Sequence, residues 1–415
     1  MVKRKSLRER GGRLSAFPVE YVTVPLTVLA AVVVIMSFTG LWPEQENVYN
    51  SYTLQACAWL GGRLDVENRA WLELAVCDGR YYVSFPPFPS YMMLPFAAIC
   101  GEHTPDHLIS LAVTLIGAIY AVRLYRNVGR DMKRAAFFAL FLYLGNGYLF
   151  IAMRGWVWFI AQSMCFTLSL MALSYAVEGR GGRALLCWAC AVGCRPMVAL
   201  YLPLLAHTLW RAWRAEHPMG TLRQMIRAKG WWVLAPAVLA MSYMALNFMR
   251  FGSILEFGHN YLPEFTRTQT GQFSLGYAGE NVKKLLRIPE PDKASGVVSY
   301  PRHEGMAFFL VDPMLVVAMA GWPLALVRRR RGERVMRLVL PALLAAHAVI
   351  ICCHRTLGGW QFGNRYLLDL LPYVYFGLIR LKPEDERFAQ LCLPLFVLGA
   401  ALNLVGTVGV YNAWI

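Results

Sequence analysis

Long apolar runs separated by short polar connectors dominate the chain. A helix of about 20 apolar residues is long enough to cross a hydrocarbon core of ~30 Å. Charged residues gather at the ends of the runs. The pattern therefore predicts an all-α integral membrane protein, a polytopic bundle of about 11 transmembrane helices. The predicted spans are residues 20–42, 105–124, 135–152, 156–177, 184–194, 197–212, 230–249, 306–327, 336–353, 366–381 and 388–411.

Residues 86–100 are apolar but too few to cross the membrane comfortably, and Pro86, Pro87, Pro89 and Pro95 interrupt them. If this segment crossed, every later basic connector would move to the outer side of the membrane. We therefore expect an interfacial or re-entrant helix at the outer face.

Residues 184–210 form a second unusual stretch, because Arg195 and Pro196 stand at its middle. An arginine halfway along an apolar segment is costly in lipid, and a proline breaks the helix. We expect two short helices in a hairpin whose tip presents Arg195 to the outer side.

Charge places the protein in the membrane and orients it. The sequence is 57% hydrophobic and 16% charged, with a net charge of +16. Most lysines and arginines lie at the N-terminus or in alternate short connectors, as expected for cytoplasmic loops during insertion. This distribution argues against nucleic-acid binding. It predicts a multi-pass protein of the cytoplasmic membrane with a cytoplasmic N-terminus and an extracytoplasmic C-terminus.

The chain reads as one transmembrane domain over residues 1–415, without a separate soluble domain. Two predicted external loops are long: residues 43–104, which include the interfacial segment, and residues 250–305. Long loops in a compact bundle are usually functional, so the site is expected there. Cys57 and Cys77 share the first loop and could form a disulfide in an oxidising compartment.

Carboxylates and basic residues of the outer side are the candidates for chemistry. A carboxylate near the membrane surface can remove a proton from an incoming hydroxyl, and guanidinium groups bind phosphate as a fork. The alternatives are a solvated acidic loop, salt bridges, and arginines that reach to the interface. The candidate bases are Glu44, Glu46, Asp65 and Asp78, and the candidate substrate-binding residues are Arg80, Tyr81, Arg195, Arg250, His259 and Arg365. No cofactor or metal site is predicted, although a divalent metal requirement stays open.

Several short motifs resemble the GT-C superfamily of polytopic glycosyltransferases. They are Leu64-Asp65 with Asp78-Gly79-Arg80-Tyr81-Tyr82, Leu94-Pro95-Phe96, Gly155-Trp156-Val157-Trp158, Arg195-Pro196, residues 247–259 and residues 363–372. The likeness runs from about residue 40 to residue 375, in the order and on the side that the superfamily has. The superfamily includes the protein mannosyltransferase and aminoarabinose transferase types, which this chain resembles.

The resemblance implies a function and a place for the base. These enzymes transfer a sugar from a polyprenyl phosphate, and a carboxylate just after the first span acts as base. Pro43-Glu44-Gln45-Glu46-Asn47 stands there in this chain, so Glu46 leads the candidates. The resemblance thus implies transfer to a hydroxyl of a glycan, lipid or protein at the outer face, with inversion at the anomeric carbon. The alternative is a transporter or a lipid-headgroup flippase.

Overall fold

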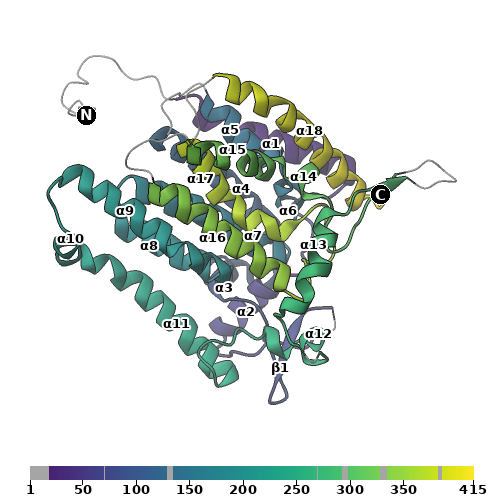
Figure 1. Ribbon diagram of the computed structural model, residues 1–415. Coiled ribbons are helices and arrows are strands. Elements are labelled where there is room, and N and C mark those ends of the chain that lie inside the picture. The colour runs from purple at the N-terminus through teal and green to yellow at the C-terminus, as the bar shows by residue number, and fades with distance from the viewer. Residues whose placement is uncertain are drawn as a thin grey trace.

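The computed structural model describes residues 18–69, 71–128, 134–268, 270–291, 298–327, 334–381 and 386–415. It is a bundle of helices with two short antiparallel hairpins, as predicted (Figure 1). Within the described residues, six helical stretches are long and apolar enough to span a membrane. They are α1 (Glu20–Thr39), α4 (Asp106–Val128), α7 (Val157–Val177), Leu222–Phe251, Met336–Cys353 of α16 (Arg334–Cys353), and Phe388–Tyr411 of α18 (Glu386–Tyr411).

Shorter helices cover the other predicted spans, because glycine, proline and asparagine break them. Residues 135–152 divide at Asn146 into two helices, and the Asn146 side-chain amide donates to Phe141 O at 2.7 Å. Asp312 interrupts residues 306–327 and accepts a hydrogen bond from Gly147 N at 3.1 Å. The helices are α5 (Ala135–Leu144), α6 (Tyr148–Ala152), α14 (Phe308–Val311), α15 (Pro313–Val327) and α17 (Leu371–Leu381).

The predicted helical hairpin around Arg195 is confirmed as two helices with a break. Helix α8 (Gly181–Val192) ends before Arg195, and a 3-10 turn, η4 (Pro196–Tyr201), leads into α9 (Leu202–Glu216). The break leaves Arg195 in an extended conformation with φ −141° and ψ 99°. Its side chain can therefore point away from both helices.

Helix α7 is the centre of the bundle and is buried along most of its length. It packs against α4, α8, α9 and α17. Near it, the rings of Tyr201 and Tyr373 stack with centroids 3.4 Å apart. The remaining helices are α10 (Leu222–Lys229), η5 (Gly230–Val233), α11 (Leu234–Phe251) and η8 (Arg365–Leu370).

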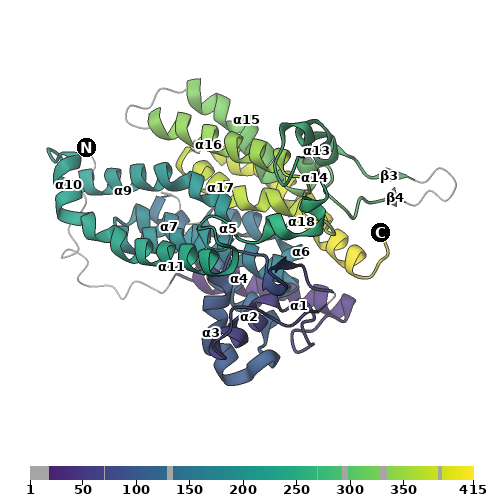
Figure 2. The same cartoon turned by 90° about the horizontal axis from the view of Figure 1, so that it is seen from below.

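Both long loops fold at the same end of the bundle, which we call the loop end, whereas α10 lies at the far end (Figures 1 and 2). Helix α3 (Phe88–Cys100) has 13 residues and packs on α2 (Ser51–Leu60), and that it does not cross the membrane stays a prediction. The other elements here are β1 (Leu74–Cys77), β2 (Arg80–Val83), η2 (Gly101–His103), η6 (His259–Tyr261), α12 (Pro263–Thr266), η7 (Leu275–Tyr277), α13 (Ala278–Leu286), β3 (Glu290–Pro291) and β4 (Val298–Ser299).

Contacts between the two loops explain why they fold together. The rings of Phe85 and His259 meet edge to face, with centroids 5.3 Å apart. Arg250, at the end of α11, donates to Val83 O at 3.1 Å. Residues far apart in sequence are thereby brought over the same part of the bundle. Cys57 and Cys77 are both free thiols, so the disulfide considered for them is not formed.

Candidate functional site

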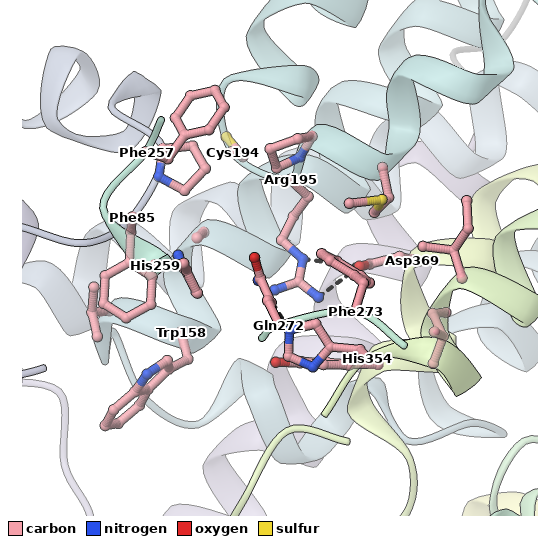
Figure 3. Close-up of a pocket in the computed structure, with 18 of the residues that line it drawn as sticks. Phe85, Trp158, Cys194, Arg195, Phe257, His259, Gln272, Phe273, His354 and Asp369 are labelled. Carbon is pink, nitrogen blue, oxygen red and sulfur yellow. Dashed lines mark hydrogen bonds and ion pairs between the residues drawn. The ribbon is translucent and has the colours of Figure 1, made fainter. Parts of the chain in front are cut away.

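Two adjoining cavities lie at the loop end. Cavity one has a volume of about 340 Å³ and is shown in Figure 3. Cavity two has a volume of about 360 Å³. Residues of the two loops, of α7 and of η8 line both cavities. The cavities are neighbours, because several residues line both and form a shared wall. The residues that line both are Phe85, Trp158, His259, His354, Arg365 and Tyr366.

A buried ion pair forms one side of cavity one. Arg195 Nε and Nη2 each lie 2.9 Å from Asp369 Oδ2 (Figure 3). Both side chains line the cavity, but that of Asp369 is 4% exposed and that of Arg195 is 23% exposed, so the arginine is the more open of the two. The other carboxylate oxygen, Oδ1, accepts from Gln162 Nε2 at 2.8 Å. Asp369 therefore fixes Arg195 from behind while the cavity stays in front of it.

Arg365 stands between the two cavities and is almost fully buried. Its Nε and Nη2 donate to Gly358 O at 2.8 and 2.5 Å, whereas Nη1 is buried without a hydrogen-bond partner among the described residues. Gly358 has φ +108°, and a Cβ there would lie 2.8 Å from Arg365 Nε, so a glycine is required. The Tyr366 ring lies 4.8 Å from Arg195 Cζ and 5.2 Å from Arg365 Cζ. A buried guanidinium donor without a protein partner is available to a water or to an anion.

His259 and His354 also line both cavities, and the surroundings keep them neutral. Burial lowers the pKa of each to about 4, with the Arg195 charge acting in the same direction. His354 also lies 3.1 Å from the Gln272 side-chain amide, through its Nε2 (Figure 3). At neutral pH these imidazoles are therefore polar groups without charge, and the arginines carry the positive charge of the wall.

Three further carboxylates line the cavities. In cavity one, both Glu256 oxygens bond within their own loop, to Gly258 N and to the Asn260 amide, each at 2.6 Å. Cavity two holds Glu73 and Glu264. Glu73 Oε2 accepts from Trp158 Nε1 at 3.0 Å. Partial burial raises the pKa of Glu73, and it raises the pKa of Glu264 together with the negative charge of Glu73.

Aromatic rings form much of the remaining wall of cavity two. Tyr49 lies 5.2 Å from Trp156 and 5.1 Å from Trp158, measured between ring centroids. Trp360 lies 5.8 Å from Trp156. The packing fixes these large rings, so that cavity two combines a rigid aromatic wall with two carboxylates.

Three of the sequence-predicted site residues lie in the cavities: Arg195, His259 and Arg365. The four predicted bases line neither cavity. Glu44 and Glu46 are exposed on the segment after α1, and Asp65 is half-buried before β1. Asp78 and Gly79 have φ angles of +50° and +74° and form the tight turn between β1 and β2.

The other predicted binding residues also lie outside the cavities. Arg80 is exposed and Tyr81 is half-buried on β2. Arg250 is buried, but its guanidinium group bonds to Val83 O, Leu246 O and the Asn247 side chain. Arg250 therefore ties α11 to the first loop.

The sequence did not point to Gln162 or Asp369. Glu73 and His354 are among the polar residues predicted for the outer side of the membrane, but the sequence did not distinguish them from the others. One signal was available for Asp369, because an ionisable residue inside a predicted span calls for an oppositely charged partner. Asp369 lies shortly after the start of the predicted span 366–381. Arg195, in the middle of the apolar stretch 184–210, is the oppositely charged residue of another predicted span. The sequence contains no signal that Glu73, rather than Glu46, faces a cavity.

Comparison with solved structures identifies the architecture. The structure of ArnT from Cupriavidus metallidurans bound to undecaprenyl phosphate matches with a TM-score of 0.51 at 13% identity, over 93% of this chain and 76% of that chain. Its apo form matches with a TM-score of 0.52 at 12% identity, with the same coverage. ArnT is an aminoarabinose transferase of the GT-C superfamily. This chain has the GT-C fold.

The fold match confirms the resemblance read from the short motifs, and with it the multi-pass membrane architecture. No protein-family model and no curated protein sequence matches the chain. The structural comparison therefore shows the fold alone. The evidence for an activity comes from the residues that line the cavities.

Proposed function

We propose that this chain is a GT-C glycosyltransferase that moves a sugar from a polyprenyl phosphate to a hydroxyl acceptor at the outer face of the cytoplasmic membrane. The observation that carries the proposal is the pair of arginines on the cavity walls. Arg195 lines cavity one, and Arg365 lines both cavities and has a buried Nη1 without a partner among the described residues. Undecaprenyl phosphate, the ligand of the ArnT structure with this fold, has the phosphate that such a site would take.

The chemistry of cavity one suits a lipid phosphate. Beside the arginines it is lined by apolar side chains, among them Met197, Leu255, Phe257 and Ile350. An isoprenoid tail would lie against these groups, since apolar surface leaves water favourably. The phosphate would then face the arginines at the wall shared with cavity two.

The arginines would act as the donor bond breaks. When the bond between the anomeric carbon and the phosphate oxygen is cleaved, the electron pair stays on the phosphate, and its negative charge increases. Fixed guanidinium groups stabilise such developing charge, because they are oriented before the reaction. Asp369 and Gly358 O hold the two guanidinium groups. A single displacement of this kind inverts the anomeric centre.

A transfer assay tests the proposal. Membranes containing the protein are supplied with a panel of labelled undecaprenyl-phosphate-linked sugars and, separately, with sugar nucleotides. We expect transfer from at least one lipid-linked donor, and loss of transfer in the Arg195→Ala/Arg365→Ala double variant at equal protein level. Transfer from sugar nucleotides alone, or from no donor, would overturn the proposed function.

A further inference from the structure

Cavity two has a chemistry that phosphate binding does not explain. Glu73 and Glu264 line it together with Tyr49, Trp156 and Trp360. Carboxylates repel a phosphate, so the part of the cavity that holds them suits another portion of the reactants. A site of aromatic rings with a few hydrogen-bonding groups suits a carbohydrate, because the rings cover the C–H faces of a sugar while the polar groups bond its hydroxyls.

The lining carboxylates differ in what remains free for a ligand. Both oxygens of Asp369 are engaged, by Gln162 and Arg195, and both oxygens of Glu256 bond within its loop. Glu73 uses Oε2 as the acceptor for Trp158, which lines both cavities. This contact places Glu73 beside the wall that the cavities share and leaves Oε1 for a hydroxyl. Glu264, the other carboxylate of cavity two, has both oxygens free among the described residues but no hydrogen bond that holds it to the shared wall.

We propose that cavity two binds the acceptor as a carbohydrate and that Glu73 takes the proton of the attacking hydroxyl. The inference rests on the proposed function and adds to it the acceptor class and the base. Trp158 is then a positioning residue, because its indole N–H orients the Glu73 carboxylate without itself meeting the reacting atoms.

The step balances as a single displacement. The acceptor oxygen forms a bond to the anomeric carbon, and its proton passes to Glu73 Oε1. The bond between that carbon and the phosphate oxygen breaks, and the polyprenyl phosphate leaves with the electron pair. The leaving phosphate would lie by Arg195 in cavity one, whereas Glu73 lines cavity two and Arg365 lines both. An inverting transfer then requires the acceptor to attack from the Glu73 side, opposite the phosphate.

The titration of the neighbouring groups is compatible with a base at Glu73. Glu264, His259, His354 and Arg365 share cavity two with it. Burial raises the pKa of Glu73, while the bond from Trp158 and the charge of Arg365 lower it. A carboxylate with a raised pKa accepts a proton more readily than a free one.

The first test is an amide series with a matched control. Glu73→Gln keeps the shape and loses proton acceptance, so transfer should fall ~100- to 10,000-fold. Binding of undecaprenyl phosphate should persist, since the phosphate contacts are elsewhere, and this also shows that the variant is folded. Glu280→Gln, on the exposed face of α13 outside both cavities, should keep transfer. Normal transfer by Glu73→Gln would overturn the inference, as would an equal loss in one of the other first-loop variants, Glu44→Gln, Glu46→Gln, Asp65→Asn or Asp78→Asn.

The second test separates a positioning role of Trp158 from a purely structural one. Trp158→Phe keeps an aromatic ring but removes the N–H that stabilises the ionised Glu73. The pKa of Glu73 should rise further, so the acidic limb of the pH–rate profile should move to higher pH. A uniform loss of rate with an unmoved limb would rule out action through Glu73.

The third test addresses the acceptor class. The donor that serves in the transfer assay is offered with two acceptor pools, cell-envelope glycans and glycolipids on one side and delipidated protein on the other. Label should enter the carbohydrate pool, and Glu73→Gln should abolish it. Label in protein alone would overturn the acceptor class while leaving the proposed transferase function intact. No label from any donor would instead refute the transferase function itself, and this inference with it.

Discussion

Arg365→Ala is the substitution whose effect on donor binding the geometry defines best. In the wild-type protein Nε and Nη2 are engaged by Gly358 O, whereas Nη1 is buried and has no hydrogen-bond partner among the described residues. A phosphate bound against Arg365 would receive at least one charge-assisted hydrogen bond from Nη1. The alanine variant removes that bond and the charge behind it.

The expected loss follows from the value of one such bond. A hydrogen bond to a charged group contributes about 2–3 kcal/mol, which corresponds to a ~30- to 150-fold weaker Kd. Arg365→Lys keeps the charge but cannot hold Gly358 O and a phosphate with one fork, so a loss of about tenfold is expected. The order wild type, lysine, alanine is the signature of a phosphate contact.

The assay is titration of the detergent-solubilised protein with undecaprenyl phosphate, followed by tryptophan fluorescence or native mass spectrometry. Thermal denaturation is measured beside it, because the loss of the bonds to Gly358 O also removes a support of the loop. Arg287→Ala is the matched control. Arg287 likewise holds loop carbonyls, donating to His303 O at 2.7 Å and Gly305 O at 3.0 Å, but it lines neither cavity.

The two variants separate a binding role from a structural one. If Arg365→Ala binds undecaprenyl phosphate as tightly as the wild type while remaining folded, the reasoning about Nη1 is wrong. If Arg287→Ala loses as much affinity as Arg365→Ala, the effect belongs to the loops in general and the phosphate contact is refuted.

Three other predictions concern the ion pair, a histidine and the topology. Asp369→Asn leaves the charge of Arg195 without its partner, so the free energy of unfolding should fall by on the order of 3 kcal/mol. The unpaired charge should also bind undecaprenyl phosphate more tightly, and weaker binding at unchanged stability would contradict this. The pKa of His354 is lowered to about 4, so the unfolded chain binds a proton that the folded one does not, and stability should fall as pH drops from about 6.5 towards 4. His354→Gln should flatten that dependence, which pH-resolved thermal denaturation would show, and an equally steep curve in the variant would refute it. Reporter fusions after Gly101 and after Arg130 should read outside and inside, and an inside signal at Gly101 would mean that residues 86–100 cross the membrane.

The sequence by itself determined the features that depend on composition and local pattern. Apolar runs predict membrane helices because each backbone group in lipid must bond within its own helix. Arg195-Pro196 predicts a break, and the structure has that break between α8 and η4. The short length and prolines of residues 86–100 likewise predict a helix that does not span, and α3 has 13 residues.

The tertiary structure alone decided whether a predicted span is one helix or two. Residues 135–152 are apolar except at Gly145-Asn146-Gly147, and that short run by itself does not decide between one helix and two. The division is supported by Asn146, whose side chain bonds to Phe141 O and to Met314 N across the bundle. Such a contact depends on a partner distant in sequence, and the pattern of apolar residues does not contain it.

The sequence likewise predicted only part of the candidate site. Arg195 could be singled out because a guanidinium group inside an apolar stretch is costly in lipid, and Arg365 because it stands in a glycine-rich turn before Tyr366. Both signals are visible locally. The partner of Arg195 could not be singled out, since Asp369 is 174 residues away and becomes its neighbour only when η8 packs beside the hairpin. Glu46 and Glu73 are both acidic residues of the same loop. Both are also exposed, but Glu73 lines cavity two and accepts a hydrogen bond from Trp158 of α7, whereas Glu46 lines neither cavity. Only the packing of the loop against α7 and the second loop decides this, because the wall of a cavity is a property of the assembled surfaces and not of the residue.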